Sequence, residues 1–171
     1  VMITSEEYFV SIPANSEKTA KIFISVPSCI NEFSSTFSVI IKSMKTNAIA
    51  QRSVYLNIKG KVVCLTGLVI DKKEANPEET VSIEVSFTNP SEEASSSLIL
   101  KTFINDPSGN IVKTFEDRIE KVEAKQTKKV LYTYSVGKYD KPGSYKVSVY
   151  LFDNLNREVD SLKGEFYVNP T

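Results

Sequence analysis

Apolar and polar residues alternate in several short runs along the chain, and each run predicts a β-strand. In residues 81–87 and 145–151, every second residue is a large apolar or aromatic one. Side chains of a strand point alternately to its two faces, so this pattern buries one face and leaves the other in solvent. Turn-forming Gly, Pro, Asn and Asp separate the runs at intervals of roughly ten residues, and helical periodicity is weak. The pattern is typical of an all-β sandwich.

Residues 65–171 contain seven of these runs. They cover residues 66–71, 81–87, 98–104, 111–115, 128–136 and 145–151, and the last run ends at residues 166–168. Seven strands in about 100 residues is the size of one immunoglobulin-like or fibronectin-like sandwich. We therefore expect residues 65–171 to form a complete seven-stranded immunoglobulin-like β-sandwich.

A tight corner precedes the strand that begins at Tyr145. Pro142 has a fixed φ and Gly143 tolerates a positive one, so the chain can reverse direction there. In immunoglobulin-like sandwiches, a tyrosine just after such a corner holds the start of the sixth strand by a hydrogen bond to nearby backbone. Pro142, Gly143 and Tyr145 are therefore predicted to form a structural corner.

Residues 1–64 resemble the end of this sandwich. Residues 12–26 align without a gap on residues 122–136, and, after a two-residue adjustment, residues 37–41 align on residues 145–149. Further on, Leu56 and Ile58 align on Phe166 and Val168. Nothing upstream corresponds to residues 66 to about 110, so the repeat predicts that residues 1–64 are only the C-terminal part of an immunoglobulin-like sandwich. Because the first residues already read like the inside of a strand, we expect the chain to be part of a longer protein.

Half a sandwich leaves its inner face uncovered. The predicted inner face includes Ile22, Ile24, Val39, Ile41, Leu56 and Ile58. Soluble monomers rarely expose an apolar patch of that size, so we expect a protein partner or the missing N-terminal strands to cover it. The alternatives are strands from the parent protein, strands exchanged in a homo-oligomer, and a strand donated by a neighbour.

Cys29 and Cys64 are the only cysteines. In the predicted topology, both lie at the same end of the first repeat and can meet in a disulfide, which would close a loop of about 35 residues. The alternative is two separate thiols in a reducing compartment. An even number of cysteines with none left over favours the disulfide.

Composition excludes several function classes. The chain has 21 basic and 21 acidic residues, so it lacks the positive field that nucleic-acid binding needs. Its apolar runs are far shorter than the ~20 residues that span a bilayer, so we expect no direct membrane insertion. It has no histidine, which removes the commonest general base and zinc ligand. We expect no catalytic residues and no enzyme activity.

Two further groups of side chains are candidate binding sites. Asp153, Asn154 and Asn156 offer oxygen ligands at close spacing, but no third carboxylate follows at ligand spacing beyond Glu158, so we interpret them as a polar turn. No metal site and no cofactor is expected. Tyr150 and Phe152 occupy alternate positions of their strand that face outward. They form a candidate interaction surface, because exposed aromatic rings can stack on sugars or anchor a protein. The alternative is that they lie against the other repeat or an edge strand.

Three stretches carry a resemblance to known families. Residues 77–89 and 140–149 resemble the cell-adhesion-related immunoglobulin-like modules of bacteria and archaea, and residues 12–27 look like the related module found beside carbohydrate-active enzymes. The chain departs from these patterns at Glu78, where a glycine is usual, and at residues 34–36, which replace a Pro-Gly pair. The resemblance implies tandem modules of secreted or cell-surface proteins.

Together these features predict a non-catalytic structural or adhesive module of a secreted or cell-surface protein. One form of this prediction is a module that is assembled by strand completion with another chain. The alternative function is a carbohydrate- or protein-binding accessory module of a larger extracellular enzyme.

Overall fold

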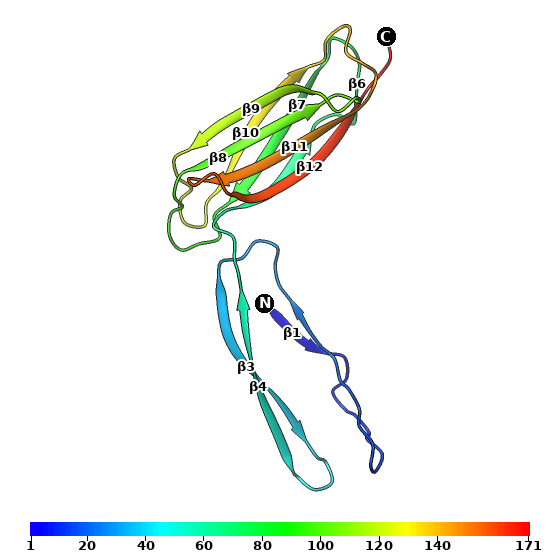
Figure 1. Ribbon diagram of the computed structural model, residues 1–171, viewed down its shortest axis with the longest axis vertical. Coiled ribbons are helices and arrows are strands. Elements are labelled where there is room, and N and C mark those ends of the chain that lie inside the picture. Colours follow the sequence, from blue (N-terminus) through cyan, green and yellow to red (C-terminus); the bar gives the residue numbers. More distant parts are fainter.

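The computed structural model describes residues 1–171 and contains twelve β-strands and no helix (Figure 1). The all-β fold class is therefore confirmed, and no helix is present that could cross a membrane. The strands are β1 (Met2–Ser5), β2 (Ile22–Ser25), β3 (Phe33–Lys42), β4 (Ile49–Ile58), β5 (Cys64–Ile70), β6 (Glu74–Ala75), β7 (Thr80–Thr88), β8 (Leu98–Asn105), β9 (Ile111–Ile119), β10 (Thr127–Ser135), β11 (Gly143–Asp153) and β12 (Glu158–Val168).

Strands β5 to β12 form a sandwich of two sheets, which we call the C-terminal sandwich. One sheet has the order β10-β7-β5 and the other the order β6-β12-β11-β8-β9. All seven strands predicted for this part are present, and the additional β6 is a two-residue strand that runs parallel to β12. The inward residues of β7, β8 and β11 alternate with outward ones and are buried, as the pattern of the sequence indicated. They form most of a single core of 21 apolar residues.

The corner before β11 has the expected backbone. Gly143 has a φ of 133°, and a Cβ at this position would lie 2.9 Å from Cγ of Pro107. A side chain would therefore be strained there and crowded as well. Tyr145 is buried, and its ring stacks on Phe166 with 5.4 Å between centroids. Burial, followed by the charges of nearby carboxylates, raises the pKa of Tyr145, while a hydrogen bond to the Lys141 backbone acts in the opposite direction.

Two other buried tyrosines donate hydrogen bonds to carboxylates at the surface of the sandwich. The hydroxyl of Tyr132 donates to Asp117 at 2.5 Å, and that of Tyr134 donates to Asp140 at 2.7 Å. Burial raises the pKa of both tyrosines above the ordinary value, and the adjacent carboxylate raises it further because it disfavours a second negative charge.

These raised pKa values predict a loss of stability in alkali. The unfolded chain ionises its tyrosines from about pH 10, while the folded chain keeps these two protonated. The free energy of unfolding therefore keeps its full value below that pH and falls above it by roughly 1.4 kcal/mol per pH unit for each of the two tyrosines. Urea midpoints measured from pH 8 to 11 should show this decline. The decline should be shallower in Tyr132→Phe/Tyr134→Phe and unchanged in Tyr139→Phe, whose ring is exposed. Equal slopes in all three proteins would contradict the prediction.

Residues 1–62 form two separate two-stranded ladders, β1 with β2 and β3 with β4. In Figure 1 they diverge from the end of the C-terminal sandwich, with β1 and β2 on one side and β3 and β4 on the other. No residue before Val63 is buried. The predicted exposure of the first part is therefore present in the structure, although Val39, Leu56 and Ile58 are half-buried within their own ladder.

Each ladder has one apolar face. In the β3–β4 ladder, this face carries Phe33, Phe37, Val39, Ile41, Val54, Leu56 and Ile58, as the pairing register shows. The opposite face is more polar, with cross-strand hydrogen bonds from Ser34 to Asn57 and from Gln51 to Ser38, although it also exposes Ile40, Ile49 and Tyr55. In the β1–β2 ladder, Ile3 pairs with Ile24. We call these two surfaces the open faces.

The pairing of β3 with β4 recurs in the C-terminal sandwich, between β11 and β12, at one constant offset along the sequence. Ser35 pairs with Leu56 as Tyr145 pairs with Phe166. We call the shift that takes Ser35 to Tyr145 and Leu56 to Phe166 the repeat offset. The two-residue adjustment that we inferred from the sequence is therefore wrong: the register aligns Ser35, and not Phe37, with Tyr145. Because the shift is two residues, the inward and outward faces remain as predicted.

The loop before β2 also recurs at the repeat offset. Asn15 and Lys125 both have a φ of 57°. The turn around each is closed by a backbone hydrogen bond, from Ser16 to Pro13 at 3.3 Å and from Gln126 to Glu123 at 3.1 Å. Non-glycine residues rarely adopt a positive φ, so this agreement supports the repeat independently of the strand pairings.

Candidate functional site

A disulfide joins the first part of the chain to the C-terminal sandwich. Cys29 and Cys64 are bonded, with their Cα atoms 5.7 Å apart, which confirms the predicted disulfide. Cys64 is the first residue of β5, and Val63 before it is already buried in the sandwich core. The bridge therefore links the loop after β2 to a strand of the C-terminal sandwich. The sequence had predicted a disulfide within the first repeat. The expected division at residue 64 stays a prediction.

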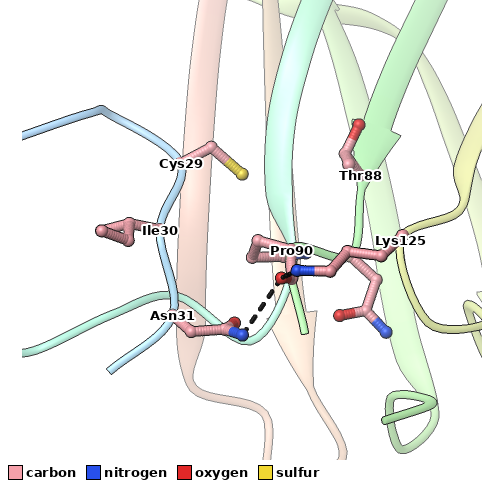
Figure 2. Close-up of a pocket in the computed structure, with 7 residues that line it drawn as sticks. Cys29, Ile30, Asn31, Thr88, Pro90 and Lys125 are labelled. Carbon is pink, nitrogen blue, oxygen red and sulfur yellow. Dashed lines mark hydrogen bonds between the residues drawn. The ribbon is translucent and has the colours of Figure 1, made fainter. Parts of the chain in front are cut away.

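A hydrogen bond at Pro90 also links the loop after β2 to the loop after β7 of the sandwich (Figure 2). The side-chain amide of Asn31 donates to the Pro90 carbonyl at 3.1 Å, and the Lys125 ammonium donates to the same oxygen at 2.7 Å. Pro90 follows Asn89, whose buried side chain donates to the carbonyls of Glu93 and Val122. The acceptor is thus held on a rigid part of the sandwich. Asn31, Pro90 and Lys125 line a shallow hollow of about 400 Å³ together with Cys29, Ile30, Thr88 and Asn89 (Figure 2).

Asp160 of β12 binds the linker between β4 and β5. One carboxylate oxygen accepts a hydrogen bond from the Lys61 ammonium at 2.7 Å, and the other accepts one from the Leu65 backbone at 2.9 Å. The Asp160 side chain is largely buried, so this ion pair is less screened than one at the surface. The charge therefore fixes the exit of the linker on the sandwich.

The linker also packs directly on the loop after β2. The Lys61 amide donates to the Ile30 carbonyl at 2.9 Å. A Cβ on Gly60 would overlap the carbonyl carbon of Asn31 and the nitrogen of Glu32. Both are backbone atoms, so any side chain at position 60 would push the two segments apart. We call the contacts of residues 29–31, 60–65, 89–90 and Asp160 the joint.

Sequence reasoning found the disulfide but missed the rest of the joint. Asp160 had a detectable signal, since it pairs with buried Leu151 and so occupies an inward position of β12, where a carboxylate is unusual. Gly60 and Asn31 had none, because their role arises only when two separate segments of the chain meet.

The predicted interaction surface lies on the outer face of the five-stranded sheet. Tyr150 and Phe152 are half-buried and stack with 6.2 Å between ring centroids, and Phe103 meets Tyr150 edge to face at 6.0 Å. The ammonium of Lys101 lies 5.9 Å from the centre of the Phe152 ring. We call these four residues the aromatic strip. The sequence predicted Tyr150 and Phe152 but not Phe103, because Phe103 belongs to β8 and only strand pairing brings it next to Tyr150.

In the polar turn that begins at Asp153, the carboxylate is bound by the turn itself. Asp153 accepts hydrogen bonds from the backbone of Leu155 and Arg157 and from the Arg157 side chain. These bonds, led by that from the Arg157 backbone, lower the pKa of Asp153. Its carboxylate is thus used by the turn itself. The structure has no group of three or more His, Cys, Asp or Glu side chains arranged to hold a metal ion.

These features define an all-β protein with an immunoglobulin-like sandwich and a disulfide-linked joint. No protein-family model matches the chain, and no curated protein is significantly similar to it. Solved structures share the sandwich fold at low sequence identity.

A β-glucuronidase of Bacteroides uniformis matches with a TM-score of 0.53 and 21% identity, over 67% of this chain and 15% of its own length. A putative β-galactosidase of Bacteroides fragilis matches with a TM-score of 0.52 and 18% identity, over 67% of this chain and 18% of its own. The CARDB domain of the PF1109 protein of Pyrococcus furiosus, solved with di-metal ions, matches at a TM-score of 0.45 and 15% identity, over 63% of this chain and 85% of its own. The similarity to the two enzymes thus covers a small part of each.

Proposed function

We propose that the chain is a non-catalytic structural module of a secreted or cell-surface protein, which holds neighbouring β-modules at a fixed angle. The observation that carries this proposal is the joint, in which the Cys29–Cys64 disulfide, the Lys61–Asp160 ion pair and the Asn31–Pro90 hydrogen bond connect the two parts. Only residues 59–63 separate β4 from β5. A linker this short that is also bonded on both sides limits bending. Structural disulfides persist in oxidising compartments, which supports a location outside the cytosol.

Residual dipolar couplings test the rigidity of the joint. In the oxidised chain, couplings from the β3–β4 ladder and from the C-terminal sandwich should fit one common alignment tensor. In Cys29→Ala/Cys64→Ala, the two sets should require separate tensors, because the cross-link between the two parts is lost. A spacer function would be refuted if the oxidised chain already required two tensors while each part gave an internally consistent one.

A second candidate function is a ligand-binding accessory module of a larger extracellular enzyme. The specific observation in its favour is the aromatic strip, which lies on an outer sheet face. Flat arrays of aromatic rings bind sugars and protein side chains by stacking.

The double variant Tyr150→Ala/Phe152→Ala tests this second function. Retardation of the chain in gels that contain xylan, mixed-linkage glucan or pectin is the measurement. A binding module predicts retardation in at least one gel that the double variant loses and that Tyr139→Ala, with an exposed ring outside the strip, retains. The structural function predicts no retardation of any of the three proteins.

A further inference from the structure

The open faces have buried counterparts in the C-terminal sandwich. Ile41 corresponds to Leu151 at the repeat offset; its exposed fraction is 65%, against 0% for Leu151. Ile12 corresponds in the same way to Val122, with 53% against 0%. The residues of each pair are both apolar and hold equivalent positions of the repeat, so the difference in burial comes from what lies over them.

Three strands account for this difference. In the C-terminal sandwich, β8 pairs with the edge of β11 that faces away from β12, β7 pairs with β10, and β5 pairs with β7. Their inward side chains, among them Val81, Ile83, Leu100 and Ile104, complete the core. The first part has counterparts of β9, β10, β11 and β12 in β1, β2, β3 and β4, and none of β5, β7 or β8.

The pairing of β1 agrees with this correspondence. In the C-terminal sandwich, Phe115 of β9 stacks on Tyr132 of β10 with 4.5 Å between ring centroids. Their counterparts at the repeat offset are Ser5 and Ile22, which are direct partners in the β1–β2 ladder. The two strands thus lie beside each other in both parts. They form a backbone ladder only in the first, where β1 has no counterpart of β8 to pair with.

A second copy of this chain does not offer the strands that are lacking. Its own β5, β7 and β8 are engaged in its C-terminal sandwich, where their inward side chains are buried. Its first part would supply only further counterparts of β9 to β12.

We propose that the open faces are the docking site for a three-stranded β-segment with the apolar alternation of residues 65–105. This inference rests on the proposed structural function and names its partner. The segment pairs one strand with β3, so that Phe37 lies opposite the counterpart of Ile104, and another with β2, so that Ile22 lies opposite the counterpart of Ile83.

One position distinguishes the docking segment from residues 65–105 themselves. A Cβ on Gly164 would lie 3.0 Å from Ile70 and 3.1 Å from Leu68, both of β5. The counterpart of Gly164 in the first part is Val54. The docking segment therefore carries smaller side chains where β5 has Leu68 and Ile70.

The test uses the chain's own strands as the probe. A second copy of residues 65–110 is joined directly to Val1, the counterpart of Ile111, in a chain that also carries Val54→Gly to make room for Leu68 and Ile70. The proposal expects hydrogen exchange of the β3 amides to slow at least tenfold, and fluorescence of the apolar dye ANS bound to the protein to fall. A matched control carries Ile83→Asp and Val85→Asp in the added copy only, and should exchange like the Val54→Gly chain without an added copy.

Two outcomes would overturn the proposal. One is an unchanged β3 exchange rate in the fusion. The other is an unfused chain that sediments as a dimer with slowly exchanging β3 amides, which would assign the open faces to a second copy. Neither outcome affects the dipolar couplings across the joint, so a failure of this inference is distinguishable from a failure of the structural function.

Discussion

Phe166→Ala is expected to destabilise the C-terminal sandwich by about 3–5 kcal/mol, whereas the matching change Leu56→Ala costs under about 1 kcal/mol. Phe166 is almost fully buried and packs against the rings of Tyr134 and Tyr145. Its removal leaves a cavity that the surrounding strands cannot fill. Leu56 occupies the same position of the earlier ladder but has solvent over its face, so its truncation creates no cavity.

Urea unfolding followed by circular dichroism measures both changes, since the C-terminal sandwich contributes the cooperative transition. The unmodified chain is the reference for each variant. A loss for Leu56→Ala as large as that for Phe166→Ala would mean that the first part is packed in solution, contrary to the open faces in the structure.

Removing the disulfide is expected to loosen the joint by roughly 3–4 kcal/mol, which the loop-entropy relation gives for a closed loop of about 35 residues. The double variant Cys29→Ala/Cys64→Ala avoids leaving a free thiol. The Lys61 amide, which bonds to the Ile30 carbonyl, reports on the joint. Its hydrogen exchange should accelerate by about two to three orders of magnitude, because each tenfold change corresponds to about 1.4 kcal/mol.

Amides in the centre of β11, such as Val149, are the internal control for this experiment and should keep their exchange rates, since they lie in the core of the sandwich. An unchanged rate for Lys61 would show that Asp160 and the hydrogen bond from Asn31 to Pro90 hold the joint without the disulfide. A comparable acceleration at Val149 would show instead that the substitutions damage the sandwich itself.

Local pattern was enough to predict most of the fold. Alternation placed all seven strands of the C-terminal sandwich, because a period of two is a property of the strand and needs no knowledge of its neighbours. The corner at Gly143 was predictable for a similar reason, since a positive φ there is a local requirement. The repeat also predicted which residues form the open faces.

The candidate site was less predictable, because it depends on contacts between distant segments. Asp160 of the last strand reaches the linker that precedes β5, and Phe103 reaches Tyr150 through strand pairing. The register of β3 was wrong by two residues, since alternation looks the same after a shift of two. Only backbone pairing with β4 distinguishes the two alignments.

The sequence by itself determined that this protein is an all-β chain with an immunoglobulin-like sandwich in its C-terminal part, that its first part leaves an apolar face open, and that its two cysteines can meet. Those properties follow from the period of the apolar residues, from the turn residues and from the repeat. Only the tertiary structure decided that the disulfide joins the two parts, that Asp160 and Gly60 fix the linker, and that β1 pairs with β2. The physical reason is that a joint is made by side chains and backbone from separate segments, whose meeting depends on how the sheets pack and is not recorded in any one stretch of the chain.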